Sequence, residues 1–377
     1  MTAAFDASLA LDLVLLAMLV VIAGFIARTR SLLAAIILMG VYSLVSAIWL
    51  VVMDAADVAF TEAVVGAGVS TIILLGAILL TRAEAEKPAL AKLIVPALVA
   101  VVTGGLLVYA ALDLASFGDA ASPANAYVGR IYIERTPVEI GAPNVVTAVL
   151  ASYRGFDTLG ETVVIFAAGV GVAIMLGFGE RAATAATAAI PAPGASPGAP
   201  SGAPSGASGD HSVVLRVAAK LLIPIIALFA FYVQFHGDLG PGGGFQAGVI
   251  LAIAVILHAL VFGLRETMRA IRPGFARATA ALGVLLYAGV GVVTLTNGGE
   301  FLDYDFLFTP ETEAGIPPGL LGDPEASHHW GQHFGIFFIE LGVLLTVAAT
   351  MVTIFYGFAG RAADAPQRQA NTKGDGR

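Results

Sequence analysis

Residues 32–80 read LLAAIILMGVYSLVSAIWLVVMDAADVAFTEAVVGAGVSTIILLGAILL, and this stretch decides the fold class. Its only charged residues are Asp54, Asp57 and Glu62. A helix needs about 20 apolar residues to cross the hydrocarbon core of a bilayer. The stretch therefore predicts two membrane-spanning helices, over 32–53 and 59–81.

Similar apolar runs recur along the chain. Of its 377 residues, 58% are hydrophobic and 12% are charged, whereas soluble domains carry about 25% charged residues. The sequence predicts an all-α, multi-pass membrane protein with about nine spans, at 9–27, 32–53, 59–81, 92–112, 160–179, 214–235, 244–264, 277–296 and 333–358.

The basic residues predict the orientation of these spans. Sixteen of the 19 follow odd-numbered spans, and three (Arg130, Arg135 and Arg154) follow even-numbered ones. Basic residues collect on the cytoplasmic side of membrane proteins. We therefore expect the N-terminus outside, the C-terminus in the cytoplasm, and the cell inner (cytoplasmic) membrane as the location.

The composition also excludes several functions. The chain has no cysteine, so disulfides, iron–sulfur clusters and thiolate zinc sites on this chain are excluded. Its net charge of −8 does not favour nucleic-acid binding. We expect no cofactor, no metal site and no enzymatic activity.

A segment rich in Ala, Pro, Gly and Ser divides the chain. Residues 182–211 contain no aromatic residue other than His211 and cannot bury enough apolar surface to order themselves, which predicts a disordered linker. The predicted parts are a helical segment at 1–112, a segment with an external loop and the fifth span at 113–181, the linker, a four-helix domain at 212–360 and a cytoplasmic tail at 361–377. Within the external loop, NVVTAVLASY at 144–153 is too short to span and is expected at the interface or re-entering the membrane.

Ionisable residues inside spans are the candidates for an ion or proton path, because each costs a few kcal/mol in hydrocarbon unless it is paired or hydrated. Glu62 is either an interfacial carboxylate or a protonatable relay. Asp157 and Glu161, at spacing i, i+4, share one helix face and serve either as N-terminal caps or in proton transfer. Glu340 lies inside the ninth span, where no capping role is available. His258 is either a hydrogen-bonded packing residue or a relay.

Two glycine-rich stretches stand beside these candidates. Val65, Gly66 and Gly68 follow Glu62 and permit close packing or a local bulge. The sequence HGDLGPGGGFQAG joins the sixth and seventh spans and includes His236, Pro241, Gly242, Gly243 and Gly244. It lacks the lysine and the spacing of phosphate-binding loops, so a structural turn that docks against a neighbour is expected. A role of His236 and Asp238 in binding or sensing cations is the alternative.

Four stretches carry a resemblance to a known family. Residues 32–80 resemble the domain near the C-terminus of the A-type component of Mrp-type Na+/H+ antiporters, and also a small component of membrane-bound hydrogenases. NVVTAVLASYRGFDTLGETVVIFAAGVGV at 144–172 resembles the segment that follows it. HGDLGPGGGFQAGVILA at 236–252 and GIFFIELGVLLTVAATMVTIFYG at 335–357 resemble the B-type component of the Mrp antiporter.

The resemblance implies a non-catalytic membrane subunit of a multisubunit Na+/H+ antiporter. Such a protein contributes to the ion path and to assembly, with other antiporter subunits (large pump-type subunits among them) and membrane lipid as partners, and Na+ and H+ as transported ions. The alternative is a membrane-arm subunit of a redox-driven ion pump such as a membrane-bound hydrogenase; a third possibility is a scaffold that only seals the complex. In relatives of complex I the equivalent third span carries a π-bulge that gates a proton path, which corresponds here to Val65–Gly68, a flexible helix element.

Overall fold

The computed structural model describes residues 2–78, 90–176, 208–308 and 330–374, and these residues form helices and loops without a strand. Nine helices among them are long and apolar enough to cross a membrane, which confirms the predicted fold class. They cover 8–28, 32–52, 56–75, 92–111, 155–176, 213–236, 244–262, 273–296 and 330–359.

The first half of the chain contains five of these spans and a set of short helices. Its α-helices are α1 (Thr2–Arg28), α2 (Leu32–Val52), α3 (Ala56–Glu62), α4 (Thr71–Ile78), α5 (Leu90–Ala111), α6 (Arg130–Glu139), α7 (Val145–Ala148) and α8 (Gly155–Leu176). Its π-helices are η1 (Ala63–Ser70), η2 (Ala124–Gly129) and η3 (Val149–Tyr153). The third span is therefore α3, η1 and α4 in one continuous helix.

The second half contains the other four spans. They are α10 (Ser208–His236), α11 (Gly244–Phe262), α13 (Pro273–Thr296) and α15 (Trp330–Gly374), with α12 (Leu264–Ala270) and the short 3-10 helix η4 (Tyr304–Phe306) in the connections. Pro273 begins α13, where a missing N–H costs nothing. Gly243 and Gly263, at the two ends of α11, have φ of 112° and 106°, which side chains other than glycine rarely adopt.

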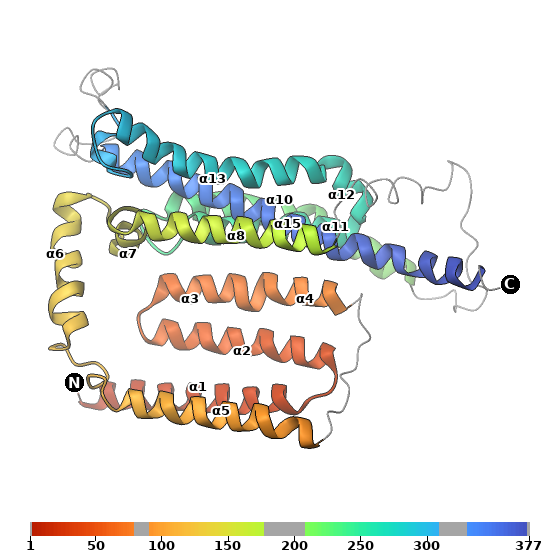
Figure 1. The fold of residues 1–377 in the computed structure, drawn as a ribbon, viewed down its shortest axis with the longest axis horizontal. Coiled ribbons are helices and arrows are strands. Elements are labelled where there is room, and N and C mark those ends of the chain that lie inside the picture. The colour runs from red at the N-terminus through yellow and green to blue at the C-terminus, as the bar shows by residue number, and fades with distance from the viewer. Residues whose placement is uncertain (1, 79–89, 177–207, 309–329, 375–377) are drawn as a thin grey trace.

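The core of the molecule lies around α15. This helix packs against α13, α11 and α8, and 67% of its apolar stretch is buried. The helices α3 and α4 lie between this group and α2, with α1 and α5 on the far side (Figure 1). No residue in the apolar stretch of α5 is buried. The second half of the chain thus forms the inner bundle, and much of the first half presents its apolar side chains outward.

Three connections gather at one end of the bundle. Asn144 contacts the turn after α10, Ser152 donates to Gln332 (2.7 Å), and Gln332 donates to Asp305 (2.9 Å). Figure 1 shows α6 and α7 at this end, with α6 lying across the direction of the spans. These contacts hold the connections of the two halves together.

The structure places helix in two segments that were predicted to lie outside the spans. The linker at 182–211 lies outside the described residues as far as 207, and its last residues are not linker, because Ser208–His211 form the start of α10. The short segment 144–153 forms α7 continued directly by the π-helix η3. Asn144 caps α7 by accepting the Val146 N–H (2.9 Å), which explains why helix begins there.

Candidate functional site

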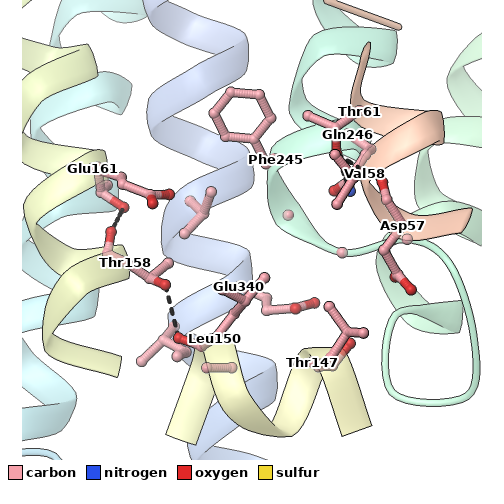
Figure 2. Close-up of a pocket in the computed structure, with 18 of the residues that line it drawn as sticks. Asp57, Val58, Thr61, Thr147, Leu150, Thr158, Glu161, Phe245, Gln246 and Glu340 are labelled. Carbon is pink, nitrogen blue, oxygen red and sulfur yellow. Dashed lines mark hydrogen bonds between the residues drawn. The ribbon is translucent and has the colours of Figure 1, made fainter. Parts of the chain in front are cut away.

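A cavity of about 300 Å³ lies where the two halves of the chain meet. Its walls come from four separate stretches: α3, the segment from α7 to α8, the glycine turn with the start of α11, and α15. Figure 2 shows the lining residues, with Glu340 and Thr147 near the glycine turn and Glu161 on the opposite wall. The polar lining residues are Asp57, Thr61, Thr147, Thr158, Glu161, Thr162, Gln246 and Glu340.

Glu340 projects from α15 toward the turn that joins α10 and α11. A Cβ added to Gly243 would stand 2.8 Å from Glu340 Oε1, and one added to Gly237 would stand 2.9 Å from Oε2. Gly244 lies directly against the backbone of α15 at Glu340. The glycines are therefore required because the carboxylate and the backbone of α15 take the space that side chains would fill. The turn therefore packs against α15 of the same chain.

The opposite wall is the first two turns of α8. Thr158 donates to the carbonyl of Leu150 (2.7 Å), and Thr162 donates to the carbonyl of Thr158 (2.8 Å). The Leu150 carbonyl belongs to the π-helix η3, so a cavity-lining hydroxyl holds this irregular backbone in place. Glu161 stands between the two threonines in sequence and also lines the cavity.

The third wall comes from α3. Gln246 donates to the Thr61 hydroxyl (2.7 Å), which in turn donates to the Asp57 carbonyl (3.0 Å). The Asp57 carboxylate accepts a hydrogen bond from Asn144 (3.2 Å). These bonds connect α3 to α11 and to the start of α7, so the cavity depends on contacts between stretches far apart in sequence.

The lining is mostly apolar but contains several groups that can bind an ion or a proton. Three carboxylates, from Asp57, Glu161 and Glu340, line a space that also offers hydroxyl and amide groups. A carboxylate within a membrane span is tolerated when it lines a hydrated cavity or pairs with another group. Carboxylate, hydroxyl and amide oxygens are the ligands that hard cations prefer.

The structure brings some of the predicted site residues together and leaves others apart. Glu340, Glu161 and the glycines 242–244 line the cavity. Asp157 is exposed and forms an ion pair with Arg154, with Nε to Oδ2 at 2.7 Å. His258 Nδ1 lies 2.7 Å from the Thr267 hydroxyl of α12, at the other end of α11, as expected for a hydrogen-bonded packing residue.

The two remaining candidate residues of the glycine turn are His236 and Pro241. His236 is the last residue of α10, and its ring stacks on Tyr232. Pro241 comes immediately before the glycines that surround Glu340. Neither residue lines the cavity.

Glu62 does not line the cavity. Its Oε1 is 2.8 Å from the position that a Cβ would take on Gly66, and the Ser43 hydroxyl of α2 crowds the same position. Gly66 belongs to η1, together with Val65 and Gly68. The irregular backbone expected at this place is therefore a π-helix, and its role as a flexible element stays a prediction.

Asp57, Gln246 and Asn144 contribute to the site although none was singled out from the sequence. Asp57 stands at the boundary of the third span, where a charge usually faces water, and Gln246 is one uncharged residue within a helix. The sequence indicated Asp57 and Gln246 only by their position near other candidates. Asp57 precedes Glu62 by five residues, and Gln246 follows the glycine turn.

Fold and site together define a multi-pass helical membrane protein of the ion-transporting class. Three family models match the chain in order. They are MbhD, a component of MBH, at residues 17–83, MbhE, a further MBH component, at 94–190, and a domain related to the MnhB subunit of Na+/H+ antiporter at 214–353. The chain belongs to the family of MnhB-type antiporter subunits, preceded here by the two MBH-type domains. This confirms the resemblance drawn from the sequence.

Individual relatives agree with this assignment. The "Putative antiporter subunit mnhB2" of Staphylococcus haemolyticus is 33% identical over 151 residues, which cover 40% of this chain and 96% of that protein. A probable K(+)/H(+) antiporter protein of the combined A/B type from Rhizobium meliloti is 28% identical over 353 residues, 90% of this chain and 33% of that protein. This chain thus spans about a third of the length of the Rhizobium relative.

A solved structure supports the fold. The Mrp complex from Dietzia sp. DQ12-45-1b contains a chain that matches with a TM-score of 0.68 at 24% sequence identity, covering 92% of this chain and 34% of that chain. Because this chain belongs to an antiporter family, its partners are the other subunits of an antiporter complex.

Proposed function

We propose that this chain forms part of the cation and proton path of a multisubunit antiporter, and that the cavity lined by Asp57, Glu161 and Glu340 lies on that path. The observation that carries the proposal is the meeting of three carboxylates from three parts of the chain in one cavity. The matching family model is described for a Na+/H+ antiporter, and one relative is named for K+/H+ exchange. Na+ is the cation proposed here.

A carboxylate in this cavity binds either a proton or a cation, because both neutralise the same negative charge. Competition between the two is the basis of exchange. Hydroxyls of Thr61 and Thr158 and the amide of Gln246 provide hydrogen bonds to a partly hydrated ion. No covalent bond of a substrate changes in such a step, so the chain acts in transport and not as an enzyme.

Other features of the proposal follow from the sequence and from exposure. Large pump-type subunits are expected to move protons across the membrane, and lipid or those subunits cover the exposed apolar side chains of α5. Positive charge on alternate connections supports the N-terminus outside and location in the inner membrane.

A redox-driven ion pump is the second candidate, because two of the matching family models describe MBH components. Purification of the complex in mild detergent distinguishes the two functions. Iron content in proportion to protein, with co-purifying subunits that bind iron–sulfur clusters, favours the redox pump; antiporter subunits without iron favour the antiporter.

The test of the ion path is the pair of substitutions Glu340→Gln and Glu161→Gln, each in the assembled complex. Glutamine keeps the size but cannot bind a proton or a cation by charge. We expect Na+/H+ exchange in inverted vesicles to fall at least about tenfold, which corresponds to about 1.4 kcal/mol, with the content of the complex unchanged.

Glu266→Gln is the matched control, because Glu266 lies in α12, is exposed and pairs with Arg269 (2.5 Å). Exchange by the two cavity variants at the rate of this control would refute the ion path. It would leave the chain as a scaffold that seals the complex.

A further inference from the structure

The side chain of Asn144 joins α3 to the glycine turn, two of the stretches that form the cavity. Its Nδ2 lies 3.2 Å from Asp57 Oδ1 of α3, 3.0 Å from the Gly240 carbonyl and 3.4 Å from the Gly237 carbonyl. Its backbone N–H donates to the Asp238 carbonyl (3.1 Å). One residue of the external segment therefore contacts both the first helix of the cavity wall and the glycine turn.

The orientation of the Asn144 amide follows from its neighbours. Its Oδ1 accepts the Val146 N–H (2.9 Å) as the cap of α7. Only an oxygen can accept this bond, so the NH₂ group must point the other way, toward Asp57 and the two carbonyls. The NH₂ group therefore stands among three oxygens, one of them from a carboxylate that lines the cavity.

The same contacts determine the shape of the glycine turn. Thr147, which follows in α7, is buried and donates to the Gly237 carbonyl (2.7 Å). Gly237 and Gly243 in turn stand against the Glu340 carboxylate. Asn144 thus contacts Asp57 directly and reaches Glu340 through the turn, so two of the three carboxylates depend on its position.

We infer that Asn144 is a positioning residue for the cation site. Its NH₂ group holds the Asp57 carboxylate and the glycine turn in the arrangement that gives the cavity its affinity for a cation. This inference rests on the proposed ion path. It adds that a residue of the external segment, outside the cavity wall, sets cation affinity.

The test is Asn144→Ser in the complete complex. Serine is as good a helix cap as asparagine, so α7 keeps its first turn, while the NH₂ donor to Asp57 is lost. Asn125→Ser is the matched control, because Asn125 lies in the same external segment and its exposed amide donates to the Asp119 carbonyl (2.9 Å).

Two measurements are needed. Hydrogen exchange of the amides in residues 236–243 is expected to accelerate about tenfold in Asn144→Ser, since the two hydrogen bonds from the Asn144 side chain to the turn are lost. The KM for Na+ in exchange assays is expected to rise about tenfold, with the maximal rate and the content of the complex within about twofold of the control.

Each result decides the inference. Unchanged hydrogen exchange in the turn overturns it, and so does a fall in maximal rate or complex content without a change in KM, because that pattern indicates a purely structural role. Faster exchange in the turn with KM unchanged, while Glu340→Gln still abolishes transport, also overturns it but leaves the ion path intact. If Glu340→Gln transports normally as well, the ion path itself has failed.

Discussion

The substitution Gly283→Ala is expected to separate two helices of the inner bundle. Gly283 lies in α13, and a Cβ there would collide with the Gly342 carbonyl and the Thr346 hydroxyl of α15 and would stand 2.8 Å from Thr346 N. Ordinary contacts begin at 3.4 Å, and the Gly342 carbonyl is closer to the added Cβ than Thr346 N, so the helices must move apart by more than about 0.6 Å. The Thr346 hydroxyl, which bonds to the Ala280 carbonyl of α13 (3.1 Å), would be displaced.

The loss of stability in Gly283→Ala follows from these two effects. Overpacking costs about 1–3 kcal/mol, and loss of an interhelical hydrogen bond in a membrane protein costs about 0.6–2 kcal/mol. Alanine has a better helix propensity than glycine, which stabilises the helix by about 1 kcal/mol. Gly289→Ala in the same helix receives this gain alone, because nothing lies within 4 Å of its added Cβ. The two variants should therefore differ by about 2–4 kcal/mol.

The assay measures the thermal midpoint of the purified complex in detergent. The readout is the size-exclusion peak that remains after heating. We expect the midpoint of Gly283→Ala to lie about 5 °C below that of Gly289→Ala. Because α15 carries Glu340, we expect the exchange activity at growth temperature to fall together with the thermal midpoint. Equal midpoints for the two variants would show that α13 and α15 are not packed as described.

Two further predictions concern the third span and the orientation of the chain. Glu62→Gln should abolish exchange with the complex intact, and Glu62→Asp should retain part of it; wild-type exchange by the glutamine variant would leave Glu62 as an interfacial anchor. Because the chain has no natural cysteine, single cysteines at Asp119 and Glu266 report topology cleanly. An impermeant thiol reagent should label the first from outside and the second only after permeabilisation, and the reverse pattern would overturn the orientation.

Hydrophobic length was enough to predict the spans. Backbone N–H and C=O groups find no partner in lipid, so an apolar stretch of spanning length must be helical wherever it lies in the chain. The π-helix at Ala63–Ser70 was expected only through the resemblance, since a stretch such as AVVGAGVS does not by itself distinguish a π-helix from a small-residue packing surface.

The candidate site was partly predictable for the same reason. Glu340 and Glu161 were identifiable because a carboxylate within a span is costly unless it is paired or hydrated. Asp57 was not, since at the end of a span a charge has an ordinary explanation. Asn144 and Gln246 carry no charge, and their importance lies in their partners, which are 87 to 185 residues away in sequence.

The sequence by itself determined the class of the protein, the number of its spans and the carboxylates able to act within them. These properties depend on hydrophobicity and charge, which each residue brings with it. Only the tertiary structure decided which carboxylates share a cavity, separating Glu340 and Glu161 from Asp157 and bringing in Asp57. It also gave the reason for the glycine turn, because the space that its side chains would need belongs to a carboxylate on a helix almost a hundred residues further along the chain.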